Sequence, residues 1–93
     1  MCSIQQGDVV VSNVGRDSGK TFLVIAVKEN MVYIVNGKER KVSNPKKKNI
    51  KHLTKIFNAS LIELAEKIKN GERVGNKTVY RNLKAEKQKL QED

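Results

Sequence analysis

Two neighbouring segments, TFLVIAV at 21–27 and MVYIV at 31–35, are apolar at nearly every position. Their β-branched and aromatic residues favour strands, but a strand with one exposed face alternates apolar and polar side chains. Both segments therefore require cover on both faces of the sheet that they form. A chain of 93 residues has room for one compact domain, so the cover must come from within the same small fold.

Turn signals divide the first 55 residues into short strands. The strongest of them is Asn36-Gly37, because both positions of a two-residue hairpin turn need positive φ. It predicts that the chain returns antiparallel, with Tyr33 opposite Arg40 on one face. The strands expected from these signals are residues 8–13, 21–28, 31–35, 38–43 and a short one around 49–53.

Two helices are predicted for the second half. Ser60 and Glu63 form a capping box that opens the first helix, Asn70-Gly71 ends it, and Asn76 caps the second. The first helix should pack on the sheet through one apolar side, formed by Leu61, Leu64, Ala65 and Ile68. A thinner stripe on the second helix consists of Val79, Tyr80, Leu83 and Leu90.

These elements together predict a mainly β fold with C-terminal helices. A small five-stranded barrel occupies residues 1–56, and a helical extension at residues 57–93 packs on it. The last residues are expected to fray.

The charge of the chain is strongly positive and unevenly placed. Nineteen lysines and arginines against ten acids give a net charge of +9, a balance expected of a protein that meets polyanions. Residues 1–57 carry +7 of this charge and residues 58–93 carry +2. The predicted barrel should therefore be the part that meets the polyanion.

Several classes of protein are disfavoured by what the chain carries. Cys2 has no disulfide partner, and His52 stands alone, so neither a metal site nor a catalytic dyad can be built around them. The longest apolar run is too short to span a bilayer, and MCSIQQGD does not resemble a signal peptide. We expect a cytoplasmic protein that has no enzymatic activity, cofactor, metal or membrane association.

The stretch GRDSGKT at 15–21 resembles a phosphate-binding loop but fails its spacing. That loop needs four residues between its first glycine and the Gly-Lys pair, and only three stand here. The lysine should also open a helix, whereas Lys20 precedes a strand. The glycines instead predict a tight turn that presents Arg16 and Lys20 to a phosphate backbone. Asp17 is expected to orient Arg16 or to close the loop through its own backbone.

The segment GDVVVSNVGRDSGKTFLVIAV at 7–27 resembles the KOW motif, the strand-loop-strand unit of RNA-binding SH3-like barrels. The following NGKERKVSNPKKKNIKHL is similar to the basic barrel of an archaeal and eukaryotic large-subunit ribosomal protein family, and short bacterial KOW-domain proteins share this pattern. The resemblance covers about residues 5–55. It implies an SH3-like barrel that binds RNA.

Basic residues crowd the segment that follows the predicted hairpin turn. Eight cations and one acid lie within residues 38–55, a density that favours a phosphate-contacting surface over an ordinary solvated one. With Arg16 and Lys20, the predicted RNA-binding residues are Lys38, Arg40, Lys41, Lys46, Lys47, Lys48, Lys51 and Lys55. The role expected for Tyr33 is partial burial in the barrel, with stacking on a base as the alternative, and Tyr80 is assigned to helix packing.

The leading hypothesis is an RNA-binding protein that docks on structured RNA, with ribosomal RNA of the large subunit as the expected target. The alternative is a protein-interaction module, a transcription- or ribosome-associated factor that uses the barrel and the C-terminal helices. Charge reversal at 46–48 should abolish RNA binding, whereas partner binding should depend on Val79, Leu83 and Leu90. Nonspecific compaction of DNA would instead give equal affinity for duplex DNA and RNA at every salt concentration.

Overall fold

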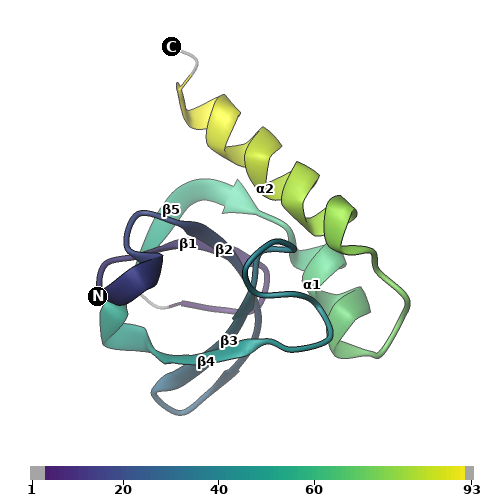
Figure 1. Cartoon of the computed structure of the whole chain (residues 1–93), viewed down its shortest axis with the longest axis horizontal. Helices are drawn as coiled ribbons and strands as arrows, with labels where there is room; N and C mark the ends of the chain where they lie inside the picture. The colour runs from purple at the N-terminus through teal and green to yellow at the C-terminus, as the bar shows by residue number, and fades with distance from the viewer. Residues whose placement is uncertain (1–3, 92–93) are drawn as a thin grey trace.

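The computed structural model describes the backbone of residues 4–91 and the side chains of this range except those of 57–59 and 88–91. Five antiparallel strands form one sheet in the order β4-β3-β2-β1-β5, which curls into a half-barrel (Figure 1). The strands are β1 (Asp8–Ser12), β2 (Thr21–Lys28), β3 (Met31–Val35), β4 (Lys46–Asn49) and β5 (Leu53–Ser60). The other elements are two short 3₁₀ turns, η1 (Gly15–Asp17) and η2 (Ile50–His52), and two helices, α1 (Ile62–Lys69) and α2 (Asn76–Gln91). The predicted fold class, a small five-stranded SH3-like barrel followed by two helices, is confirmed.

The apolar strand β2 is buried on both faces, as its sequence predicts. Phe22 and Val24 belong to the core inside the curled sheet. Leu23 and Ile25 point the other way, into a second core that the helices complete with residues such as Ala65, Ile68, Val79 and Leu83. Figure 1 shows both helices beside the sheet, with the C-terminal part of α2 projecting away from it. The helices are therefore part of the fold, because they cover the outer-face residues Leu23 and Ile25.

Each helix begins against a glycine of the barrel. Gly7 (φ +93°) lies against Ile62, and a Cβ at this glycine would be 2.5 Å from the Cα of Ile62. Gly37 (φ +78°) lies against Asn76, whose carbonyl oxygen would overlap a Cβ placed there. Only glycine combines this close approach with a left-handed backbone. The two contacts fix where α1 and α2 start relative to the sheet.

The predicted hairpin at Asn36-Gly37 is wrong, and so is the strand at 38–43. The buried Asn36 side chain accepts hydrogen bonds from the backbone N–H groups of Lys38 (3.0 Å) and Arg40 (2.9 Å), so these donors are not free to pair with β3. Residues 36–45 form a loop, and β3 pairs with β4 instead. Tyr33 consequently lies opposite Lys47 and not opposite Arg40.

The strand expected around 49–53 is also wrong. Residues 50–52 form η2, and β5 runs from Leu53 to Ser60, beyond the predicted end of the barrel at residue 56. Because Ser60 pairs with Asp8 in the sheet, it does not cap α1, whose N-cap is Leu61 without a side-chain hydrogen bond.

Asn76 does not cap α2 but opens it, and its Oδ1 accepts a hydrogen bond from the N–H of Val42 (2.8 Å). This contact ties the 36–45 loop to the first turn of α2. The predicted end of the first helix at Asn70-Gly71 is confirmed, since Asn70 is the C-cap of α1 and Gly71 has φ +83°. The last two residues, for which fraying was expected, lie outside the described part of the chain.

Candidate nucleic-acid interface

The loop between β1 and β2 is organised around Asp17. The backbone N–H of Lys20 donates to the carbonyl oxygen of Asp17 (2.9 Å), which confirms that this residue closes the loop through its backbone. The carboxylate has a role that the sequence did not reveal. Asp17 is only 7% exposed, and its Oδ2 accepts a hydrogen bond from the Nζ of Lys46 (2.8 Å). Its partner is thus Lys46, 29 residues away in sequence, and not the neighbouring Arg16.

The alternation of β4 determines which of its three lysines face solvent. Successive side chains of a strand point to opposite faces of the sheet. Lys46 and Lys48 lie opposite Ile34 and Val32, whose side chains fill the interior of the curled sheet. Lys47 lies between them, points to the other face and is exposed. Two of the three consecutive lysines therefore start toward the inside of the barrel.

Lys48 is the buried member of this run, with 8% of its surface exposed. Its ammonium group donates to Ser12 Oγ (2.8 Å) and to the carbonyl oxygen of Val14 (3.4 Å), and it lies 4.0 Å from Asp17 Oδ2. A phosphate could reach Lys48 only by displacing these partners. The RNA contact predicted for Lys48 is therefore disfavoured, and charge reversal at 46–48 would disrupt the barrel as well as any bound RNA.

This network shifts the pKa values of two of its members. The hydrogen bond from Lys46 lowers the pKa of Asp17, helped by the charges of Lys46, Lys48 and Lys20 and opposed by burial. Burial is the main reason that the pKa of Lys48 is lowered, and the charge of Lys46 adds to it while Asp17 opposes it. The charge of Arg40 also lowers the pKa of Lys48. The 15–20 and 36–45 loops thus bring their charges close to the same buried group.

The lowered pKa of Lys48 predicts that the stability of the folded protein depends on pH. Between its folded pKa and 10.5, the unfolded chain binds more protons at this residue, so stability rises with pH across that window. We expect the free energy of unfolding of the wild type, relative to that of Lys48→Met, to rise from pH 7 toward pH 10.5. Chemical denaturation at both pH values, with Lys47→Met as the exposed control, measures the difference. A difference in stability between the wild type and Lys48→Met that is the same at both pH values contradicts the prediction.

Two other predicted RNA-binding lysines have acidic partners. Lys20 Nζ lies 3.8 Å from Glu39 Oε1, and Lys55 Nζ lies 3.4 Å from Asp8 Oδ2. The side chains of Lys20 and Glu39 are 41% and 33% exposed, so this pair is weak and Lys20 can exchange it for a phosphate. The pair also joins the 15–20 loop to the 36–45 loop.

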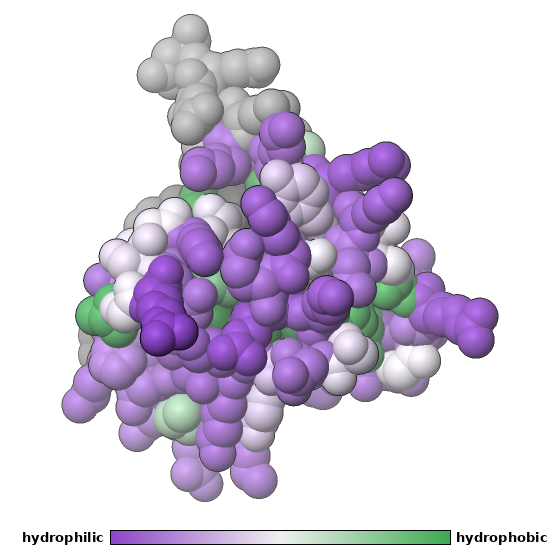
Figure 2. Space-filling model, viewed as in Figure 1, coloured by the Kyte–Doolittle hydropathy of each residue, from purple (hydrophilic) through white to green (hydrophobic). Residues whose placement is uncertain are grey.

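Six predicted RNA-binding residues have no ion pair within the described part of the chain. They are Arg16, Lys38, Arg40, Lys41, Lys47 and Lys51, of which Arg40 is half-buried and the others are exposed. Five cations share the two adjoining loops, which we call the two-loop surface: Arg16, Lys20, Lys38, Arg40 and Lys41. Figure 2 shows that the face of the molecule on this side is largely hydrophilic.

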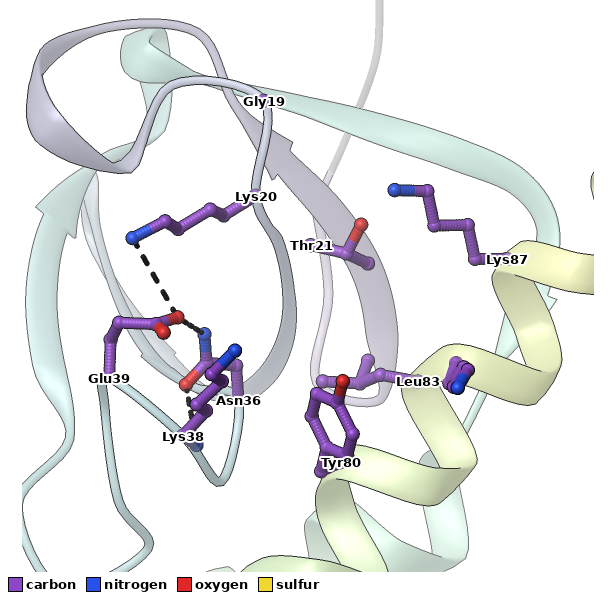
Figure 3. Close-up of a pocket in the computed structure, with 10 residues that line it drawn as sticks. Gly19, Lys20, Thr21, Asn36, Lys38, Glu39, Tyr80, Leu83 and Lys87 are labelled. Carbon is purple, nitrogen blue, oxygen red and sulfur yellow. Dashed lines mark hydrogen bonds and ion pairs between the residues drawn. The ribbon is translucent and has the colours of Figure 1, made fainter.

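A cleft of about 510 Å³ separates this surface from α2. Lys20 and Lys38 line it from the loops, and Tyr80, Lys84 and Lys87 line it from α2 (Figure 3). Tyr80 is 43% exposed, so its assignment to helix packing is wrong. The signal that could have found these three residues is their spacing, because positions i, i+4 and i+7 lie on one face of a helix.

Two apolar residues of α2, Val79 and Leu83, lie in the core. Val79 is fully buried and Leu83 is 4% exposed, so neither is available to a protein partner without unpacking the helix. The side chain of Leu90, the third residue assigned to such a partner, lies outside the described residues. Tyr33 is half-buried and packs on the core beneath the helices, which favours the structural role over base stacking.

In the described residues, no group of three or more His, Cys, Asp or Glu side chains could hold a metal ion. Neither helix, over its described length, combines the length and apolar character needed to cross a membrane.

Comparison with known proteins finds no family model that matches the chain and no curated protein that matches its sequence.

Proposed function

We propose that this protein binds structured RNA through the two-loop surface. The observation that carries the proposal is the concentration of five cations on two adjoining loops, opposed there only by the loosely paired Glu39 and the buried Asp17. Loops that a sheet holds in place can present cations at fixed positions along a phosphate backbone. Backbone contacts of this kind recognise the shape and charge of the RNA more than its sequence.

Ribosomal RNA of the large subunit is the target that we propose. The resemblance of residues 5–55 to KOW-motif ribosomal proteins supports this choice, and the half-barrel is the architecture which that resemblance implies. Lys47 and Lys51 are exposed on other elements, β4 and η2, and could extend the contact. Lys48 is excluded from the interface because its ammonium group is buried and hydrogen-bonded.

The salt dependence of binding tests the electrostatic part of the proposal. Five phosphate contacts should give a slope of log K against log salt of about −3.5 to −4.5. Fluorescence anisotropy with a labelled stem-loop RNA, titrated between 50 and 200 mM salt, measures this slope. Failure to bind any structured RNA at the lowest salt contradicts the proposal.

Sedimentation tests the proposed target. A tagged form expressed in its native cells should co-migrate with large-subunit particles through a sucrose gradient at low salt and should leave them as salt rises. Binding to stem-loop RNA in vitro with migration only at the top of both gradients would contradict the ribosomal target and leave another RNA as the ligand.

A further inference from the structure

The cleft beside α2 has walls that the fold holds in place. The 36–45 loop is fixed to the first turn of α2 by the contact of Gly37 with Asn76 and by the hydrogen bond from Val42 to the Asn76 side chain. Lys20 lies on the same loop side of the cleft, between Gly19 (φ +85°) and the first residue of β2. Because Leu83 is buried at the base, α2 cannot shift without exposing the core. The cleft is therefore formed before any ligand arrives.

The charge of the cleft exceeds what the fold requires. Four lysines and one glutamate line it, which gives a net charge of +3. Lys38, Lys84 and Lys87 are exposed, and none of them has an ion pair within the described residues. Their mutual repulsion stabilises nothing in the folded chain, but it creates a positive potential that attracts an anion.

Tyr80 gives the cleft an aromatic surface among these cations. Figure 3 shows its ring rising from α2 across from Asn36 and Lys38, while the Lys87 side chain extends toward the segment of Gly19 and Thr21. An exposed aromatic ring flanked by lysines is the combination that binds an unpaired nucleotide, because the ring stacks on the base and the cations meet its phosphates. The volume of about 510 Å³ lies in the range of small-ligand sites.

We propose that this cleft holds an unpaired nucleotide of the bound RNA, with its base stacked on Tyr80 and its flanking phosphates between the lysines of the loops and those of α2. The inference rests on the proposed RNA-binding function and adds a site to it. Bases within a duplex already stack on their neighbours, so the cleft selects a bulged, looped or single-stranded segment. It also gives α2 a role in RNA binding.

Substitutions at Tyr80 separate stacking from charge. The probes are a 12-nucleotide uridine strand and a blunt 12-base-pair RNA duplex, both measured by fluorescence anisotropy at 50 mM salt. Tyr80→Leu should weaken binding of the single strand about tenfold, whereas the matched control Tyr80→Phe should keep its affinity. Both variants should bind the duplex within twofold of the wild type. Equal affinities of the two variants for the single strand, or equal losses on both probes, would overturn the inference.

The lysines of α2 provide a second measurement with the same probes. The double variant Lys84→Gln/Lys87→Gln should lower the salt slope for the single strand by about 1.4, more than for the duplex. The control Lys28→Gln/Lys67→Gln removes the same charge from exposed positions outside the cleft lining. Equal effects of the two double variants on the single strand would show that only net charge matters and would overturn the inference.

Photocrosslinking locates the base directly. A uridine strand that carries one 5-iodouridine should crosslink to Tyr80, as identified by mass spectrometry of the digested complex, and crosslinks that form only elsewhere would overturn the site. Wild-type protein that binds neither probe contradicts the proposed function itself. Wild-type protein that binds both probes without using Tyr80 contradicts the nucleotide site alone.

Discussion

The triple variant Arg16→Gln/Lys38→Gln/Lys41→Gln should bind structured RNA about a thousandfold more weakly than the wild type at 50 mM salt. All three side chains are exposed, lie on the two-loop surface and have no ion pair among the described residues, so their removal leaves the fold intact. Counterion release makes each phosphate contact worth roughly tenfold in affinity at this salt concentration. Anisotropy titrations with the stem-loop RNA measure the loss.

A control variant with the same net charge separates the effect of the two-loop surface from the effect of net charge. Lys28→Gln/Lys67→Gln/Arg73→Gln removes three exposed cations from the end of β2, from α1 and from the segment before α2. We expect it to lose less than tenfold in affinity, because charge effects are largely screened beyond about 14 Å at 50 mM salt. If both triple variants weaken binding equally, RNA is attracted by net charge alone and the two-loop surface is not the interface.

The strands β1, β2 and β3 and the two-sided core could be predicted because their signals are local. A run such as TFLVIAV fixes both the strand and its burial, since alternate side chains of one strand enter opposite cores. The end of α1 at Asn70-Gly71 is equally local. None of these features depends on which distant segment pairs with which.

The pairing of β3 with β4 could not be predicted, because the hydrogen bonds of the Asn36 side chain prevent the hairpin that the Asn36-Gly37 pair favours. The pair Asn36-Gly37 favours a two-residue hairpin by composition. In the structure, however, the side-chain oxygen of Asn36 accepts hydrogen bonds from the backbone N–H groups of Lys38 and Arg40, and the segment forms a loop. The lack of a side chain at Gly37 then allows the first residue of α2 to pack against it, and Gly37 does not form a hairpin turn. The same two residues are compatible with both structures until the position of α2 is known.

The error in pairing propagated into the candidate site. A lysine run placed in a loop is free to bind RNA, whereas the same run placed in β4 must turn Lys46 and Lys48 toward the barrel. The carboxylate of Asp17, which pairs with both lysines, lies 29 and 31 residues before them in the chain. No spacing in the sequence predicts an ion pair over such a separation. The α2 side of the cleft was not predicted because Tyr80 was assigned to the apolar stripe with Val79 and Leu83, whereas it is exposed and lines the cleft together with lysines of α2.

Removing the charge of Asp17 should cost about 3 kcal/mol of stability, the size expected when one partner of a buried ion pair is lost. In Asp17→Asn the buried ammonium of Lys48 loses its countercharge, and Lys46 loses the carboxylate that it hydrogen-bonds. For a domain of this size the melting temperature should fall by about 12–24 °C. Thermal melting followed by circular dichroism at pH 7 measures the change. The pKa of Asp17 is lowered in the folded protein, so its carboxylate stabilises the fold above about pH 4. The wild type should lose this stabilisation as the pH falls below that value.

Two companion variants decide whether the buried pair is the cause. Glu39→Gln removes one negative charge from an exposed pair and should cost less than about 1 kcal/mol, because solvent screens it. The double variant Asp17→Asn/Lys48→Met removes the buried ammonium together with its countercharge and should recover most of the lost stability, since Lys46, which then lacks its carboxylate, has a side chain that is 30% exposed to solvent. If the double variant is less stable than Asp17→Asn, Lys48 contributes more through its hydrogen bonds to Ser12 and Val14 than its burial costs, and the lysine at this position stabilises the barrel in its own right.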